Sequence, residues 1–232
     1  MAGKEDVSFS TRLIEALSRY RKPLIWGMAI LVVALIATFA YLEVQQRRAE
    51  EALTRVEEAE DLYQSWVDAL EDDDSAAAED IRVELETITQ EVLAKYPRKY
   101  AANRARFLQG EIYRQLEDWV SAGEAYRETA ETFPRSHLAS VSLYNAGAAF
   151  EEAGELDSAT ESFQEIEDRF GESPSPLVPQ AVFSLGRIAE ENGDFAGAEE
   201  HYQRLVENHP GSSWTSLARS RIILLTAEGR IN

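Results

Sequence analysis

The sequence predicts an all-α protein, in which one apolar N-terminal helix is followed by an α-solenoid of helix hairpins and a C-terminal capping helix. Two observations lead to this fold class. A run of 19 uncharged residues lies near the N-terminus, and one pattern of glycine, alanine and aromatic residues occurs three times further along the chain. Short turns rich in glycine, asparagine and acidic residues separate the segments of the repeated pattern, as expected between helices.

Composition excludes several classes of function. The 232-residue chain has no cysteine, so it can form neither a disulfide framework nor a zinc–thiolate site. Its 42 acidic residues against 23 basic ones give a net charge of -19, which repels phosphate backbones and makes nucleic acid an unexpected partner. The charge is uneven, because residues 1–48 carry +3 and residues 49–232 carry -22. A hydrophobic content of 44% indicates a folded chain rather than a disordered one.

The uncharged run predicts a transmembrane helix at residues 23–43. The 19 residues from Leu24 to Leu42 form a helix of roughly 30 Å, enough to cross the hydrocarbon core of a membrane. Trp26 and Tyr41 stand near its ends, where aromatic side chains favour the interface. A signal peptide cleaved after Ala40 is the alternative, although the apolar run is longer than a typical signal core.

The basic residues around this segment predict its orientation. Five of them precede the span and three follow it closely, which favours a cytoplasmic N-terminus. Residues 1–22 are then a cytoplasmic lead, either an amphipathic helix on the membrane surface or a solvated segment. In a bacterium the chain would be a single-pass inner-membrane protein with its acidic C-terminal domain in the periplasm or otherwise outside the cytoplasm.

Residues 44–97 predict a juxtamembrane helix and a first hairpin. A turn at residues 71–75 separates a helix that runs to Leu70 from a second one at about residues 78–95. Apolar residues of the first helix recur at alternating spacings of three and four, and they are Ala49, Ala52, Val56, Ala59, Tyr63, Trp66 and Leu70. This seam favours packing against the neighbouring helix of the same chain, while self-association of two chains through residues 49–70 is the alternative.

Three repeats follow, and they align on Gly110, Gly147 and Gly186. Each has an aromatic residue three positions before the glycine, alanine twelve positions after it and an aromatic residue sixteen positions after it. These residues are Phe107, Ala122 and Tyr126 in the first repeat, Tyr144, Ala159 and Phe163 in the second, and Phe183, Ala198 and Tyr202 in the third.

This pattern resembles the tetratricopeptide repeat (TPR), a helix–turn–helix unit of 34 residues. The resemblance covers residues 98–228 and divides them into repeats at 98–136, 137–174 and 175–212, with a capping helix and tail at 213–232. Residues 44–97 would then include a degenerate hairpin of the same kind. The proline-rich stretch at 171–179 is expected to be a loop. The capping helix, Trp214–Ala227, is expected to bury Leu217, Ile222, Leu224 and Leu225.

Three runs of sequence suggest a closer resemblance. Residues 181–186, 191–198 and 209–213 resemble the long-linker repeats of bacterial envelope proteins, among them the Tol-associated cell division coordinator and the lipoprotein subunit of the outer-membrane β-barrel assembly machine. The layout of lead, single span and repeats resembles instead the ancillary subunit of the Sec translocon. These families imply scaffolding and not catalysis.

Patterns typical of catalysis or of a metal or cofactor site were not found in the sequence. The three histidines, His137, His201 and His209, have no partner at metal-binding spacing. The sequence contains no nucleophile elbow, phosphate-binding glycine loop or dinucleotide fingerprint. We therefore expect a protein that is not an enzyme and that needs neither metal nor cofactor.

The resemblance to TPR proteins implies a binding groove lined by the first helix of each repeat. Position 5 of that helix is aromatic in all three repeats, at Phe107, Tyr144 and Phe183, and could be either groove or core. The other predicted groove residues are Arg104, Glu111, Arg114, Glu151, Glu152, Gln180, Arg187 and Glu190. Such a groove suits an extended or helical peptide. The pair of residue types by which some TPR proteins hold a C-terminal carboxylate is absent.

These expectations combine into a membrane-anchored adaptor for protein–protein interactions in envelope biogenesis, of the translocon or chaperone accessory type. Its partners would be exported chains, chaperones or subunits of an envelope machine. The alternative is a structural subunit of a larger envelope assembly, such as a secretion or motility apparatus.

Overall fold

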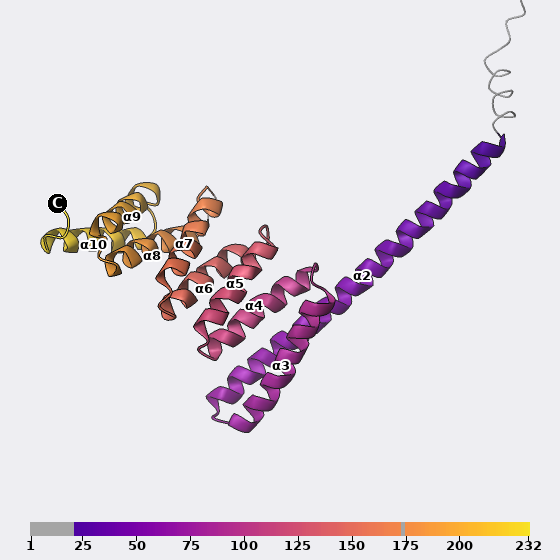
Figure 1. The fold of residues 1–232 in the computed structure, drawn as a ribbon, viewed down its shortest axis with the longest axis horizontal. Helices are drawn as coiled ribbons and strands as arrows, with labels where there is room; N and C mark the ends of the chain where they lie inside the picture. The colour runs from indigo at the N-terminus through magenta and orange to yellow at the C-terminus, as the bar shows by residue number, and fades with distance from the viewer. Residues whose placement is uncertain (1–20, 173–174) are drawn as a thin grey trace, which may run out of the picture. The chain divides into compact units, whose positions relative to one another are not determined.

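A computed structural model describes residues 21–172 and 175–232, and all regular structure in these two ranges is α-helical (Figure 1). The predicted fold class is thereby confirmed, while the expected lead at residues 1–22 lies almost wholly outside the described residues. The helices are α2 (Arg21–Glu71), α3 (Ser75–Lys95), α4 (Tyr100–Gln115), α5 (Trp119–Thr132), α6 (Leu138–Glu152), α7 (Leu156–Phe170), α8 (Leu177–Glu191), α9 (Phe195–Asn208) and α10 (Ser213–Ala227). The chain divides into two units, residues 1–51 and 52–232.

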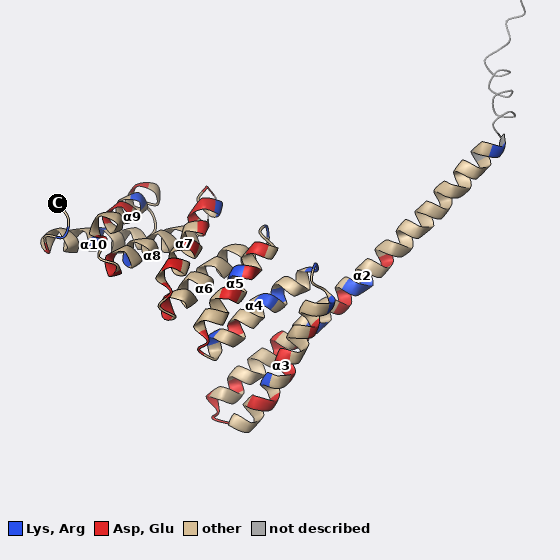
Figure 2. Cartoon of the chain, in the orientation of Figure 1, with Lys and Arg blue, Asp and Glu red and all other residues tan. Residues whose placement is uncertain are grey.

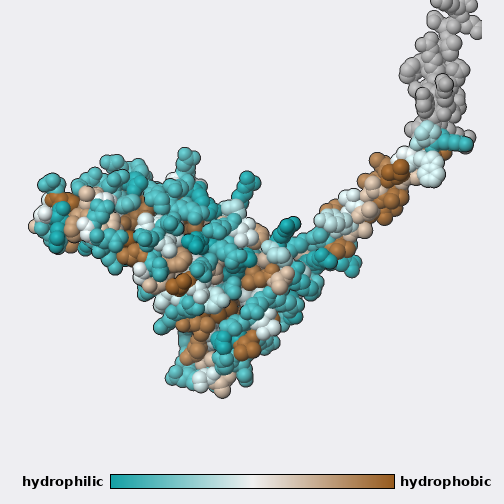
Figure 3. Space-filling model, in the orientation of Figure 1, coloured by the Kyte–Doolittle hydropathy of each residue, from teal (hydrophilic) through white to brown (hydrophobic). Residues whose placement is uncertain are grey.

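In the first unit, α2 begins with the apolar run that the sequence predicts to span a membrane. The described part of the chain contains one helix that is long and apolar enough to do so. Its large side chains are exposed, with Trp26 and Phe39 each 71% accessible. Figure 2 shows the run without charge, and Figure 3 shows its hydrophobic surface. A surface of this kind is stable in lipid and costly in water, so α2 is a candidate membrane span.

In the second unit, the remainder of α2 packs on α3 and α4. Trp66 and Ala59 lie in a cluster with Leu85 of α3 and Leu108 of α4. Five residues of the predicted seam are buried within the chain, and they are Ala52, Val56, Ala59, Tyr63 and Trp66. This seam is therefore occupied by helices of the same chain, and its buried part offers no surface for pairing two copies.

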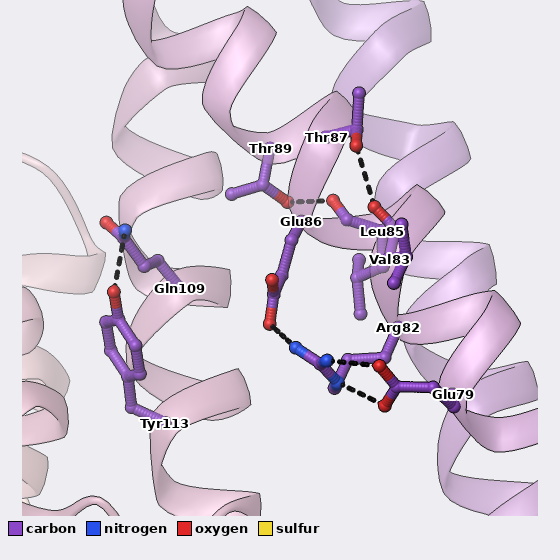
Figure 4. A network of polar contacts seen from close by, with 9 residues as sticks. All are labelled: Glu79, Arg82, Val83, Leu85, Glu86, Thr87, Thr89, Gln109 and Tyr113. Carbon is purple, nitrogen blue, oxygen red and sulfur yellow. Dashed lines mark hydrogen bonds and ion pairs between the residues drawn. The ribbon is translucent and has the colours of Figure 1, made fainter.

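Polar side chains form hydrogen bonds along α3 and along α4 (Figure 4). Arg82 donates to Glu79 at 2.6 Å and to Glu86 at 2.5 Å, one turn before and one turn after it. On α4, the side chain of Gln109 donates to the hydroxyl of Tyr113 at 3.4 Å. Ion pairs at spacings of three and four residues stabilise an exposed helix face modestly, so the burial of Leu85 and its neighbours remains the main reason for the position of α3.

The repeated glycines set the closeness of the helices in each later hairpin. A methyl group at Gly110 would stand 2.6 Å from a ring carbon of Tyr126, and one at Gly147 would stand 2.6 Å from Phe163. At Gly186 the corresponding distance to Tyr202 is 2.4 Å. These distances are far below van der Waals contact. Hydrogen is thus the only side chain that fits while the aromatic ring of the second helix lies on the first.

The turns inside the hairpins share one left-handed residue. Gly154 and Gly193 have φ of +76°, and the equivalent residue of the first hairpin is Glu117, with φ of +58°. In two of the three turns an aspartate then caps the second helix, because Asp118 accepts from the backbone N–H of Ser121 and Asp194 accepts from that of Gly197.

Two predictions about the C-terminal half need correction. Pro179 is not in a loop, because α8 begins at Leu177 and the proline occupies its first turn, where no backbone N–H is needed. In α10, Leu217 and Leu224 are 49% and 42% exposed instead of buried. The buried residues of α10 are Thr215, Ala218 and Leu225.

Candidate peptide-binding groove

The predicted groove residues lie on alternate helices. Consecutive helices from α3 to α10 pack on one another, and further contacts join α4 to α6, α6 to α8 and α8 to α10. Helices that touch their second neighbours are on the inner side of a curved stack. The inner helices α4, α6 and α8 carry every residue predicted for the groove.

The position-5 aromatics are half-buried, which places them between core and surface. The Phe107 ring lies tilted against that of Tyr126 with ring centroids 5.4 Å apart, and Tyr144 lies in the same way against Phe163 at 5.5 Å. Phe183 contacts both Tyr202 of α9 and Trp214 of α10. Each ring thus packs in part against the core. The part that remains exposed is available to a ligand.

One pocket brings three predicted residues together. Arg104, Phe107 and Glu111 line a pocket of about 470 Å³ between α2, α4 and the start of α6. Tyr63, Tyr100 and His137 line it as well, and none of the three was predicted from the sequence for this role. The Tyr100 hydroxyl lies 3.3 Å from Nε2 of His137. These residues stand on three different segments, so only the packing of α2 against α4 reveals that they share a site.

Ion pairs link neighbouring inner helices across the groove. The guanidinium of Arg187 on α8 donates to both carboxylate oxygens of Glu151 on α6, at 2.5 and 2.6 Å. Arg221 of α10 pairs in the same manner with Glu190 of α8. At the other end, Arg104 of α4 pairs with Glu60 of α2. Each pair joins one repeat to the next and holds a carboxylate that the fold has partly removed from water. None of these three pairings was predicted from the sequence.

Burial and hydrogen bonding give Glu151 and Glu190 opposite pKa shifts. Burial raises the pKa of Glu151 above its ordinary value, and Arg187 offsets this effect only in part. Burial also acts to raise the pKa of Glu190, but hydrogen bonds from Arg221 and from the Tyr202 hydroxyl, 2.5 Å away, outweigh it and leave the pKa lowered. In the second repeat, Phe163 takes the place of Tyr202 and has no hydroxyl to donate to Glu151.

The remaining predicted residues are distributed along the same face. Gln180 of α8 donates to the Tyr144 hydroxyl of α6 at 2.5 Å, and burial raises the pKa of that tyrosine. Arg114 pairs with Glu111 of its own helix at 2.8 Å. Both lie at a second pocket, of about 520 Å³, which Glu152 also lines. Tyr144, Gln180 and Phe183 line neither of these two pockets.

A comparison with protein families decides which class of solenoid this is. The family model named "Tetratricopeptide repeat" matches residues 86–137 and 144–213, more than half of the chain. The chain belongs to the tetratricopeptide repeat family. A curated "TPR repeat-containing protein" from Treponema pallidum (strain Nichols) is 32% identical over 120 residues. The match covers 51% of this chain and 48% of that protein, so the aligned region spans about half the length of its relative.

Membership of the TPR family gives the geometry a chemical meaning. TPR proteins are generally non-enzymatic scaffolds for protein–protein interactions, in which inner helices bind the partner. Here the inner helices offer half-buried aromatic rings, paired charges and two open pockets. No cluster of three histidine, aspartate or glutamate side chains able to hold a metal ion occurs in the described ranges. The arrangement is suited to the recognition of a peptide segment.

Proposed function

We propose that this TPR protein is a membrane-anchored adaptor that binds other proteins at the periplasmic face of a bacterial inner membrane. The single observation behind the proposal is the pocket of about 470 Å³ on the inner helices, where Phe107 lies between the charged Arg104 and Glu111. An apolar ring flanked by charges can bury a partner's side chain and orient its backbone. Ion pairs between repeats keep the site in place before the partner arrives, which reduces the entropic cost of binding.

The apolar start of α2 supports the membrane anchor. With the N-terminus in the cytoplasm, this helix would tether the acidic TPR domain beside the membrane outside the cytoplasm. An envelope-biogenesis role, as an accessory to a translocon or to chaperones, fits such a placement because exported chains emerge there. The partners would then be exported chains, chaperones or subunits of an envelope machine, and no cofactor is required.

Membrane topology can be tested directly because the chain has no cysteine. Single cysteines at Ser10 and at the exposed Ser216 provide one reporter on each side of the span. In intact spheroplasts, a membrane-impermeant maleimide should label Ser216→Cys and leave Ser10→Cys unlabelled until the membrane is opened. Labelling of Ser10→Cys alone would show the opposite orientation of the span. Release of the chain from membranes without detergent would refute the membrane anchor.

The pocket can be tested by photo-crosslinking in cells. Benzoylphenylalanine at Tyr100, which is 41% exposed at the pocket, is compared with the same group at Val120, which is 44% exposed on α5. We expect position 100 to capture translocon, chaperone or exported proteins that position 120 does not capture. If both positions capture the same structural proteins, or only further copies of this chain, the protein is a subunit of an assembly and the adaptor proposal fails.

A further inference from the structure

Two of the ion pairs between inner helices share one register, which the junction between α4 and α6 lacks. Counted from the repeat glycine, the residue four positions later is Glu151 in α6 and Glu190 in α8. Each pairs with an arginine of the next inner helix, Arg187 or Arg221. Both arginines stand one position after the repeat glycine or its equivalent, since Arg187 follows Gly186 and Arg221 follows the corresponding residue of α10. The residue one position after the glycine of α6 is Ala148, whose side chain cannot form an ion pair.

The glutamate position of the register also differs at the junction between α4 and α6. Four positions after the glycine, α6 and α8 have glutamate, whereas α4 has Arg114. Its guanidinium donates to Glu111 of the same helix at 2.8 Å and lies 3.5 Å from the hydroxyl of Tyr63 on α2. Glu111 also accepts from the Tyr126 hydroxyl at 2.6 Å, so both of its oxygens are occupied. Arg114 thus turns toward α2, and no side chain of α6 pairs with α4 in the described structure.

The missing pair leaves an open space. The pocket of about 520 Å³ lies between the end of α4, the start of α5 and the end of α6, with Trp119, Asn145, Ala148 and Glu152 among its lining residues. Glu152 is exposed, and it forms no hydrogen bond or ion pair with any described residue. Since Arg114 is engaged with Glu111, the free charge at the pocket is negative.

The third repeat shows what can occupy the equivalent place. Its second helix begins with Phe195, as the second helix of the first repeat begins with Trp119. The guanidinium of Arg230 lies over the Phe195 ring, 4.8 Å from its centroid. An aromatic face attracts a cation, and tryptophan does so more strongly than phenylalanine. No cation of the described chain covers Trp119 in this manner.

We propose that the pocket between α4 and α6 takes an arginine or lysine side chain from a partner protein. The cation would lie against Trp119 and Glu152 in the space above Ala148, where the chain supplies no arginine of its own. The proposal rests on the adaptor function and names the kind of partner segment that this groove selects, a basic one. Residues 49–232 carry a net charge of -22, which would attract such a segment from a distance.

Binding can be measured on the full-length chain in nanodiscs. The probe is a blocked heptapeptide of glycine and serine with one central arginine, and its control carries citrulline, the neutral isostere. The four tryptophans are labelled as 5-fluorotryptophan, and Trp119→Phe assigns one of the four fluorine resonances. We expect the arginine peptide to shift the Trp119 resonance saturably and those of Trp66 and Trp214 hardly at all. Citrulline should weaken binding at least tenfold.

Two variants test the site, and one serves as a matched control. Glu152→Gln should weaken binding about fivefold, the effect of one partly exposed ion pair. Glu191→Gln removes the equivalent exposed carboxylate of α8 and should leave binding unchanged. The double variant Arg114→Glu/Ala148→Arg introduces the register of the two following junctions, fills the pocket and should abolish binding. Circular dichroism confirms folding, and Glu152→Gln, at an exposed position, keeps the test valid if the double variant unfolds.

The outcomes separate this inference from the adaptor proposal. Equal binding of both peptides, the absence of a Trp119 shift with the arginine peptide, or unchanged binding in Glu152→Gln would each overturn the inference. If crosslinking at Tyr100 still captures partners in that case, the adaptor proposal stands alone. If crosslinking at Tyr100 captures no partner while the arginine peptide binds, the pocket is supported and the adaptor proposal fails.

Discussion

Replacing Gly147 by alanine tests whether ring-on-glycine packing determines the hairpin geometry. The added methyl group would stand 2.6 Å from both Cε1 and Cζ of Phe163 and 2.9 Å from Cδ1. The ring has no exposed surface, and Tyr144 lies against it with ring centroids 5.5 Å apart. Phe163 therefore cannot turn into solvent, and either the ring or the whole of α7 has to move.

The expected cost follows from these distances. Carbon atoms in favourable contact are about 3.5–4.0 Å apart, so the ring must retreat by about 1 Å along its whole edge. Overpacking of this kind costs about 1–3 kcal/mol, and we take the upper end because a buried ring is displaced as a unit. Alanine gains about 1 kcal/mol over glycine in a helix. The variant should thus lose about 2 kcal/mol of unfolding free energy.

Urea unfolding of the full chain in detergent, followed by circular dichroism, measures this loss. Gly211→Ala is the control, because a methyl group there meets no atom within 4 Å. The double variant Gly147→Ala/Phe163→Leu should recover part of the loss, since the smaller side chain leaves room for the methyl group. A Gly147→Ala variant as stable as the wild type would refute the reasoning and leave helix propensity as the dominant effect.

Three further predictions concern stability. Glu117→Gly should stabilise the chain by about 0.5–1 kcal/mol in the same urea assay. A residue other than glycine in the left-handed conformation costs about 1–2 kcal/mol, and the greater conformational entropy that glycine loses on folding offsets part of the gain. Asn103→Ala should cost about 1–3 kcal/mol, because this fully buried amide donates to the Thr129 carbonyl and accepts from Ser136. Falling pH should act on Glu190 and Glu151 in opposite directions. The pKa of Glu190 is lowered, so its stabilisation is retained until the pH approaches the ordinary glutamate pKa of 4.5 and is then lost. The pKa of Glu151 is raised, so the cost of its ionised form already disappears at a pH above 4.5. Unfolding measured from pH 7 to 3.5 should therefore show the wild type losing its advantage over Glu190→Gln and gaining on Glu151→Gln.

The hairpins were predictable because their packing depends on local spacing. A glycine and an aromatic residue sixteen positions later, such as Gly147 and Phe163, fall opposite each other once a short turn joins two helices. This relation involves one hairpin at a time and is visible in the sequence. The fold class followed from the same kind of periodic pattern.

The pockets and ion pairs were less predictable because they depend on the register between hairpins. Arg187 and Glu151 are 36 residues apart, and linker lengths differ between repeats. Tyr63 and His137 meet at one pocket only because α2 packs along α4. In α10 the prediction failed for another reason. All four residues from Ile222 to Leu225 are apolar, so periodicity could not decide that Leu225 is buried and Leu224 exposed.

The charge pattern of the second unit connects these results. Acidic residues occur in every helix from α2 to α9 (Figure 2), yet arginines of α4, α8 and α10 pair with Glu60, Glu151 and Glu190. Long-range attraction of a basic segment is therefore a property of the whole unit and weakens with salt. In the proposed interaction, local recognition depends on the junction at Ala148, where a pair is missing. Raising the ionic strength should thus reduce the association rate of a basic partner more than its dissociation rate changes.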